Sequence, residues 1–305
     1  MNIEYANTIP MRQILSKLGI QPVAKSDDEL LYQSPFLQSH EPSFVIKAKT
    51  NTWADLTDND SGDVVDFSIK YLRWYNLDYS HYAAIEWLKS IVGYAVLNSP
   101  KDVADYSIID SRYSYTNHGH LSTPYLIHYL EQVRGIPFDI ARFRIAEVEV
   151  HNAKTGKSFL SLGHKTEHGT FSIRNEHVKA QIKKAYVTFI RGNTYPAVRL
   201  HIFKDIFDYL SALTMRNGKE FADDVLILNT YTNVQLSAAF IYNYDYSTVY
   251  TWLDNTPVGI EATRNYRKYL KAHSVPVHMP MNKMYSKYKS LNDWLVAQRK
   301  DQQAV

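Results

Sequence analysis

Cysteine does not occur among the 305 residues of this chain. Disulfide bonds and all metal sites built on thiolates are therefore excluded. Long apolar runs are also missing, since no stretch approaches the ~18–20 residues that a membrane-spanning helix needs. The first residues, MNIEYANTIP, lack the basic and apolar regions of a secretion signal. These absences lead us to expect a cytoplasmic protein without a membrane partner.

A phosphate-binding loop is absent as well. The segment KTGKS (154–158) lacks the first glycine of the Gly-x4-Gly-Lys-Ser pattern and does not join a strand to a helix, so we interpret it as a hairpin turn. The histidines of HGH (118–120) and GHKTEHG (163–169) have no third ligand at a familiar spacing. We interpret them as surface or turn residues and expect no metal there.

The composition that is present is that of a globular protein, with 45% hydrophobic and 21% charged residues. The net charge of +3 hides an asymmetry, because residues 134–199 contain 12 Lys and Arg but only 5 Asp and Glu. Together with the 24 tyrosines, which can stack on bases, this excess predicts a nucleic-acid-binding surface. The alternative is ordinary solvated charge. The candidate residues are Arg142, Arg144, Arg174, Lys179, Lys183, Lys184, Tyr186 and Arg191.

Local patterns divide the chain into three parts. Residues 1–95 combine short strands and amphipathic helices in a small α+β domain, and residues 96–120 have no sustained period, which predicts a linker. Residues 121–305 form the second domain, whose first part (121–184) contains helices and a β-meander.

Residues 185–295 alternate nearly all-apolar strands with helices. This alternation predicts an α/β fold with a parallel sheet covered on both faces. Sites in such sheets lie at the carboxyl ends of the strands. The strand ends to inspect are 204–208, 229–230 and 254–256.

The segments HIFKDIFDYLSAL, YTWLDNTPVG and YKSLNDWLV (201–213, 250–259 and 288–296) resemble the Toprim family, a nucleotidyl-transfer and hydrolysis module of bacterial primases, topoisomerases and some nucleases. In that family the first strand ends in Glu with an Asp four residues later. A later strand ends in Asp-x-Asp, and a further loop adds acids. The resemblance implies a Toprim-type, Rossmann-like parallel core.

The first domain resembles the zinc ribbon of the same primases. The resemblance rests on YQSPFLQSHEPSFVI and NTWADLTDNDSGDVVDFSIKYL, followed by a helix with AIEWL. The two modules in this order resemble the compact primase-like proteins of bacterial mobile elements. The resemblance covers about residues 1–92 and 120–295.

The chain departs from both families at the residues that carry chemistry. The ribbon's ligand positions fall on Ser34, Leu37, Asp55 and Asp58, which do not make a zinc site. We expect packing of Phe36, Phe44, Val45, Trp53 and Phe67 to replace the metal.

In the Toprim frame the family's Glu falls on Lys204, the second Asp of Asp-x-Asp on Thr256, and the first acid of the later loop on Ser290. The resemblance leaves Asp208, Asp254, Asn292 and Asp293 in place. Two divalent ions need several bridging carboxylates to bind side by side. The positive charge of an ammonium at position 204 would repel such ions. We therefore predict that Lys204 occupies the metal position and pairs with Asp254 and Asp208.

These observations predict a catalytically degenerate primase-like protein of a mobile element or phage. It would bind DNA, single-stranded by preference, and act in replication, transfer or interference, with no cofactor. Two alternatives stay open. One is an active Mg2+-dependent primase or nuclease that uses Asp208, Asp254 and Asp293 with one weakly bound Mg2+. The other is a protein-interaction module that contacts a helicase or another replication protein.

Overall fold

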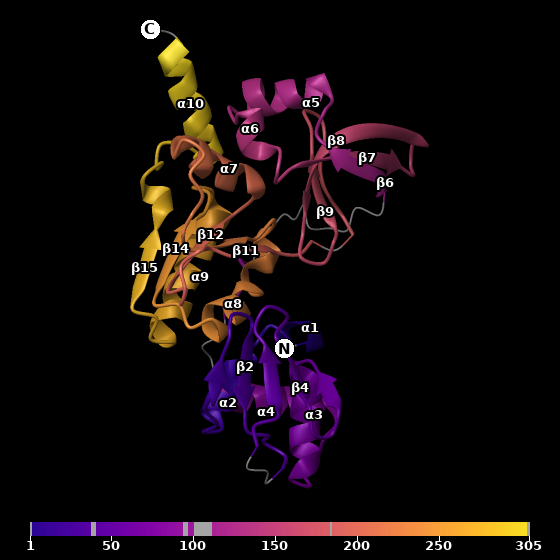
Figure 1. The fold of residues 1–305 in the computed structure, drawn as a ribbon, viewed down its shortest axis with the longest axis vertical. Helices are drawn as coiled ribbons and strands as arrows, with labels where there is room; N and C mark the ends of the chain where they lie inside the picture. Colours follow the sequence, from indigo (N-terminus) through magenta and orange to yellow (C-terminus); the bar gives the residue numbers. More distant parts are fainter. Residues whose placement is uncertain (1, 38–40, 94–96, 101–111, 184, 304–305) are drawn as a thin grey trace. The chain divides into compact units, whose positions relative to one another are not determined.

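The computed structural model describes residues 2–37, 41–93, 97–100, 112–183 and 185–303 (Figure 1). The fold is mixed α/β with three five-stranded sheets. The chain forms two compact units. Unit 1 consists of residues 1–98, 235–247 and 268–275, and unit 2 of residues 99–234, 248–267 and 276–305. Among the described residues, no helix has both the length and the apolar character that crossing a membrane requires.

Unit 1 is built on an antiparallel sheet of order β1-β2-β3-β4-β5. Its strands are Ala24–Lys25, Glu29–Tyr32, Phe44–Lys47, Thr52–Asp55 and Asp60–Gly62. Its helices are α1 (Ile3–Ala6), α2 (Met11–Lys17), α3 (Val64–Trp74), α4 (His81–Val92) and α8 (Ser237–Asn243). The side chain of Asp63 caps α3, and Asp66 completes a capping box, which explains why this helix begins where it does.

The segment 235–247 belongs to unit 1 although it comes late in the sequence. Asn243, the last residue of α8, donates hydrogen bonds from its amide nitrogen to Asn51 Oδ1 (3.0 Å) and Ala48 O (3.3 Å). The sequence assigned this segment to the second domain, because nothing local distinguishes it from the helices around it.

Unit 2 begins with an antiparallel meander of order β10-β9-β8-β7-β6. Its strands are β6 (Tyr113–His120), β7 (Ala146–Asn152), β8 (Lys157–Lys165), β9 (Phe171–Arg174) and β10 (Lys179–Ile182). Between β6 and β7 lie α5 (Pro124–His128), the π-helical turn η1 (Tyr129–Val133) and α6 (Phe138–Ala141).

The predicted linker at 96–120 needs correction. Its last eight residues form β6, which pairs with β7 from Tyr113↔Asn152 to His120↔Ala146. Residues 94–96 and 101–111 lie outside the described part of the chain. Strand β6 escaped detection because five of its eight residues in succession are exposed, so it lacks the alternation that marks a half-buried strand.

The third sheet has the order β11-β13-β12-β14-β15. Strands β12, β13, β14 and β15 run parallel, and β11 is an antiparallel edge strand. The strands are β11 (Thr188–Ile190), β12 (Arg199–Phe203), β13 (Asp224–Ile227), β14 (Thr248–Trp252) and β15 (Val277–Pro280). The helices are α7 (Ile206–Met215), η2 (Tyr231–Val234), α9 (Pro257–Ala272), η3 (Met281–Lys283) and α10 (Leu291–Gln303).

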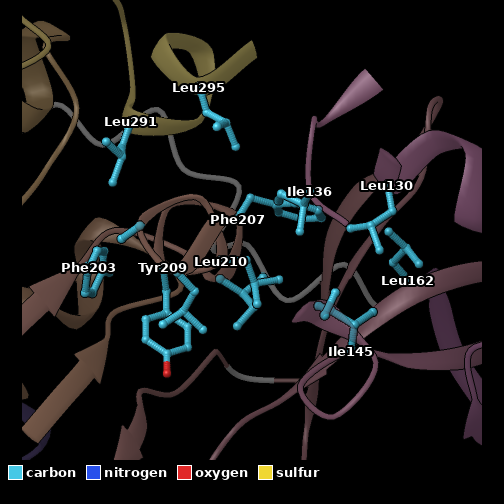
Figure 2. Close-up of a cluster of buried hydrophobic side chains, with 14 of the residues drawn as sticks. Leu130, Ile136, Ile145, Leu162, Phe203, Phe207, Tyr209, Leu210, Leu291 and Leu295 are labelled. Atoms are coloured by element: carbon cyan, nitrogen blue, oxygen red, sulfur yellow. The ribbon is translucent and has the colours of Figure 1, made fainter. Parts of the chain in front are cut away.

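The main core of unit 2 joins the meander and its helices to the parallel sheet. Figure 2 shows Leu130, Ile136, Ile145 and Leu162 from the first part facing Leu210 and Phe207 of α7, with Leu295 of α10 beside them. All are buried. This packing fixes α7 and α10, the two helices that carry Asp208 and Asp293, against one another.

Candidate functional site

The strand order of the parallel sheet reverses at β12. This strand pairs with β13 on one side and with β14 on the other, both in parallel register. In open α/β sheets, ligands bind outside the carboxyl ends of strands at such a reversal. Lys204 and Asp205 directly follow β12, and Asp254 is the second residue after β14.

Lys204 is buried at this edge, with only 7% of its surface exposed. Its Nζ donates to Asp205 Oδ2 at 3.3 Å and lies 5.9 Å from the centre of the Tyr231 ring. Burial by itself would lower the pKa of Lys204, but Asp205, Asp254 and Asp208 together outweigh burial and raise its pKa above the ordinary value. The side chain is therefore a charged ammonium surrounded by carboxyl groups.

Asp205, which sequence reasoning missed, supplies the close ion pair. We predicted a pair with Asp254, but Asp254 and Asp208 act on Lys204 through longer-range attraction. Asp205 also caps α7 by accepting from the backbone N–H groups of Phe207 (3.0 Å) and Asp208 (3.3 Å). Its position directly before an apolar helix is a cap signal that could have found it. Lys204 and Lys179 outweigh the effect of burial and hold the pKa of Asp205 well below its usual range.

Asp208 lies in the first turn of α7 and is buried. Its Oδ1 accepts the backbone N–H of Asn292 at 3.0 Å, which ties α7 to the start of α10. Burial, together with the nearby Asp205 and Asp254, raises the pKa of Asp208 well above its usual range. Burial and the neighbouring acids thus both disfavour the charged form of this carboxyl.

Asp254 is half-buried beside Tyr231. Its backbone N–H donates to the Tyr231 hydroxyl at 3.0 Å. Burial raises the pKa of the Asp254 carboxyl, although Lys204 opposes the shift. Gly259 allows α9 to approach here, because a Cβ at that position would lie 2.2 Å from Asp254 O and 2.7 Å from the Tyr231 hydroxyl.

The four predicted site residues Lys204, Asp208, Asp254 and Asp293 all line one pocket of about 160 Å³. Asp293 is exposed at its rim, where its carboxylate accepts from Ser290 Oγ at 2.9 Å. Four further cationic side chains line the same pocket: Arg134, Arg174, Lys179 and Lys289. Arg134 and Lys289 were missed, since they come from separate segments that carry no motif.

The donor set of this pocket does not suit a divalent cation. The Lys204 ammonium stands among the carboxyl groups and would repel the ion, whereas Mg2+ prefers an oxygen-rich shell. Within the part of the chain that the structure describes, no group of three or more His, Cys, Asp or Glu residues is arranged to hold a metal ion.

The predicted nucleic-acid residues do not form one surface. Among those that the structure describes, only Arg174 and Lys179 line the pocket. Arg191 forms an ion pair with Asp224 (2.8 Å) at the opposite, amino end of β13. The reason is that β11 runs antiparallel to β13 and carries the chain away from the site.

The other predicted cations also lie elsewhere. Arg144 pairs with Glu220 (3.1 Å), and Arg142 lies 3.6 Å from Asp139. Lys183 is exposed in a left-handed backbone conformation (φ 63°), and Lys184 lies outside the described residues. The Tyr186 ring stacks on His168 with centroids 3.6 Å apart, so this face of the ring is already covered.

Two of the four ribbon ligand positions of unit 1, Ser34 and Asp55, are joined by a hydrogen bond. Asp55, 1% exposed, accepts from Ser34 Oγ (2.5 Å) and Ser43 Oγ (2.9 Å). Asp58 forms an ion pair with Lys70 at 2.6 Å, and Leu37 packs against the core. The five side chains that we expected in the core of this domain, Phe36, Phe44, Val45, Trp53 and Phe67, are all buried.

His164 is buried, which corrects its interpretation as a surface or turn residue. Its Nδ1 lies 3.2 Å from Arg144 O, an atom that can only accept, so Nδ1 carries the proton. Nε2 faces the Thr188 hydroxyl at 3.0 Å. Burial lowers the pKa of His164 to about 4.

We expect acid to destabilise unit 2 through His164. Between pH 6.5 and about 4 the unfolded chain binds a proton on this ring that the folded chain does not. Stability is therefore intact above pH 6.5 and falls by up to about 3 kcal/mol toward pH 4. A pH series of urea unfolding measures this slope. His164→Asn should flatten it, and a variant with the full wild-type slope would contradict the assignment.

Comparisons with known proteins give one family match and several similar structures, among them two primase structures. A family described as a domain of unknown function (DUF8464) matches residues 115–183, which correspond to most of the meander and its helices. No curated protein matches the chain.

Both similar structures contain primase modules. The Aquifex aeolicus primase (zinc-binding and RNA polymerase domains) is 14% identical, with coverage of 94% of this chain and 83% of that chain and a TM-score of 0.37. The primase fragment of the bacteriophage T7 primase-helicase protein is 10% identical, with coverage of 87% and 93% and a TM-score of 0.41. Both TM-scores are below 0.5.

Proposed function

We propose that this chain is a primase-like protein of a mobile element or phage that binds DNA, single-stranded by preference, and no longer polymerises. Its core is of the Toprim type, and its ribbon-like domain folds without zinc. It acts in the cytoplasm, in the replication or transfer of the element or in interference with a host machine.

The observation that carries this proposal is the buried ammonium of Lys204. It lies at the strand end where the resemblance requires a glutamate, and it attracts the carboxyl groups that remain there. An ammonium is a single fixed charge that cannot bring two substrate oxygens together as a pair of metal ions does. The polar cluster at the ribbon's ligand positions, centred on Asp55, supports the same conclusion for unit 1.

A primer-synthesis assay tests the loss of polymerisation. With single-stranded templates, ribonucleotides and Mg2+ or Mn2+, we expect no template-directed product. Products that disappear when a chelator is added, and that Asp254→Ala abolishes without unfolding the protein, would instead establish the active alternative that uses Asp208, Asp254 and Asp293.

Salt titration tests DNA binding. The affinity for a single-stranded oligonucleotide should fall steeply and linearly in log–log form as salt increases, because bound phosphates release counterions. Fluorescence anisotropy between 50 and 300 mM salt, on the order of the range where such slopes are measured, provides the data. Absence of affinity at low salt would contradict a DNA-binding function.

A second candidate, a protein-interaction module, is favoured by an exposed apolar patch in unit 1. Trp74, Tyr75, Leu77, Tyr79 and Tyr82, at the turn between α3 and α4, are each 52–75% exposed. Aromatic residues of this kind are enriched at protein interfaces. In this case a helicase or other replication protein is the partner. Replacing Trp74 and Tyr82 by Ser should weaken its binding and leave DNA affinity unchanged.

A further inference from the structure

The pocket beside Lys204 contains more positive than negative side chains. Arg134, Lys204 and Lys289 come from segments that are distant in sequence, whereas Arg174 and Lys179 lie opposite each other on the paired strands β9 and β10. Four acids line the same space. Three of the acids have partners of their own. Asp205 caps α7, Asp208 accepts from Asn292, and Asp293 accepts from Ser290.

The surroundings of the pocket disfavour negative charge on two of its acids. The pKa of Asp208 is raised well above its usual range by burial and by its acidic neighbours, and the pKa of Asp254 is also raised by burial. With five cationic and four acidic side chains lining the pocket, an anion that enters meets a positive excess in partly desolvated surroundings.

The cations are crowded in the absence of an anion. The pKa of Lys179 is lowered to about 8. The main cause is the charge of the Lys204 ammonium and the second is partial desolvation, while Asp205 opposes the shift. Arg174 lies 4.0 Å from Asp205, an acid that Lys204 contacts at 3.3 Å. One carboxylate thus stands between several cations, and an additional anion would relieve the repulsion among them.

The volume of the pocket is large enough for a small anion and some of its hydrating water molecules. About 160 Å³ accommodates a phosphate group and a few water molecules. A terminal phosphate projects from its strand and, with a second pKa of about 6, carries nearly two negative charges at neutral pH. An internal phosphodiester carries one charge and is held on both sides by the chain. The charge and the concave shape therefore favour a terminal phosphate.

We propose that this pocket binds a terminal phosphate group, from a nucleic-acid strand or a nucleotide, without a divalent cation. The inference deepens the proposed function, because it rests on Lys204 as the replacement for a metal. In this proposal the half-exposed Arg174 and the exposed Lys289 contact the phosphate, and the buried Lys204 adds positive charge.

Fluorescence anisotropy in the presence of EDTA tests the inference. The probes are one labelled single-stranded oligonucleotide in three forms, with a 5′-phosphate, a 3′-phosphate or hydroxyl groups at both ends. We expect at least one phosphorylated form to bind about tenfold more tightly than the hydroxyl form, in line with a charge-assisted contact of about 1.4 kcal/mol. Competition with inorganic phosphate and with a nucleoside triphosphate distinguishes a strand end from a free nucleotide.

Variants at the rim separate this pocket from general DNA affinity. Arg174→Gln and Lys289→Gln each remove one positive charge from the pocket, and the preference for the phosphorylated probe should disappear. Lys219→Gln is the matched control, because Lys219 is exposed beyond the far end of α7 and should retain the full preference.

The outcomes distinguish the inference from the proposed function. Equal affinity for all three oligonucleotides, without competition by phosphate, overturns the pocket inference and leaves DNA binding in place. A preference that appears only when Mg2+ is added overturns both, because the site then uses a metal. Binding of the nucleoside triphosphate in EDTA without any DNA affinity supports the pocket and contradicts the DNA-binding function.

Discussion

Lys204→Met should destabilise unit 2 by about 3–5 kcal/mol, the range found when one partner of a buried ion pair is removed. The methionine side chain fills similar space, so packing changes little. The loss arises because Asp205, Asp208 and Asp254 would then share the strand end without the ammonium that attracts them. Hydrogen exchange in increasing urea, followed in peptides covering β12 and α7, measures the change in the free energy of unfolding.

The destabilisation by Lys204→Met should depend on pH. Lys204 is the main group that lowers the pKa of Asp205. The pair therefore stabilises the fold fully above the ordinary pKa of Asp, and this stabilisation is lost as pH falls from there toward the lowered pKa of the folded state. The difference between variant and wild type should therefore narrow in acid. Lys219→Met, at an exposed position, is the control. A Lys204→Met protein within about 1 kcal/mol of wild type at pH 7 would contradict the buried pair.

The Lys204→Glu variant tests whether the lysine is what prevents a divalent metal ion from binding at this strand end. Four carboxyl groups would then surround the strand end, and their repulsion should destabilise the protein until a divalent ion binds. Mn2+ at 100 times its Kd would restore about 2.7 kcal/mol. Thermal unfolding with and without Mn2+ should show a rise in Tm for this variant and none for wild type. A rise in wild type would show that the ammonium does not exclude the metal.

Phe44→Ala should destabilise unit 1 by about 3–5 kcal/mol, the cost of truncating a buried phenylalanine. Phe44 is fully buried and lies in a cluster with Phe36, Trp53 and Phe67, with ring centroids 5.4–6.1 Å away. We make this prediction because the aromatic cluster lies in the domain that resembles a zinc ribbon, where we expect packing to provide the stability that zinc would provide. Hydrogen exchange in peptides covering β3 and β4 provides the measurement.

Two controls accompany Phe44→Ala. Leu56→Ala, at a position that is 70% exposed, should change stability by less than about 0.5 kcal/mol. A strong chelator should leave wild-type stability unchanged, because aromatic packing needs no ion. Chelator-dependent unfolding of unit 1 would mean that a metal, and not the aromatic cluster, stabilises this domain.

The sequence predicted local elements well where the periodicity was strong. The strands near 199–203, 224–227 and 248–252 are nearly all apolar, and the structure places each in the parallel part of the third sheet. Strand β15 was missed because Val277–Pro280 is short and half exposed. Strand β6 was missed for the same physical reason, since exposed residues carry no hydrophobic pattern.

The sequence alone determined which chemical groups this protein has: no thiolates, a lysine where the resemblance requires a glutamate, and a basic middle segment. Only the tertiary structure decided which of them meet. It paired Lys204 with Asp205, brought Arg134 and Lys289 to the same pocket, and placed Arg191 at the far end of β13. Ion pairs and pockets depend on separations of a few ångströms, which strand direction and helix packing set and sequence spacing does not encode.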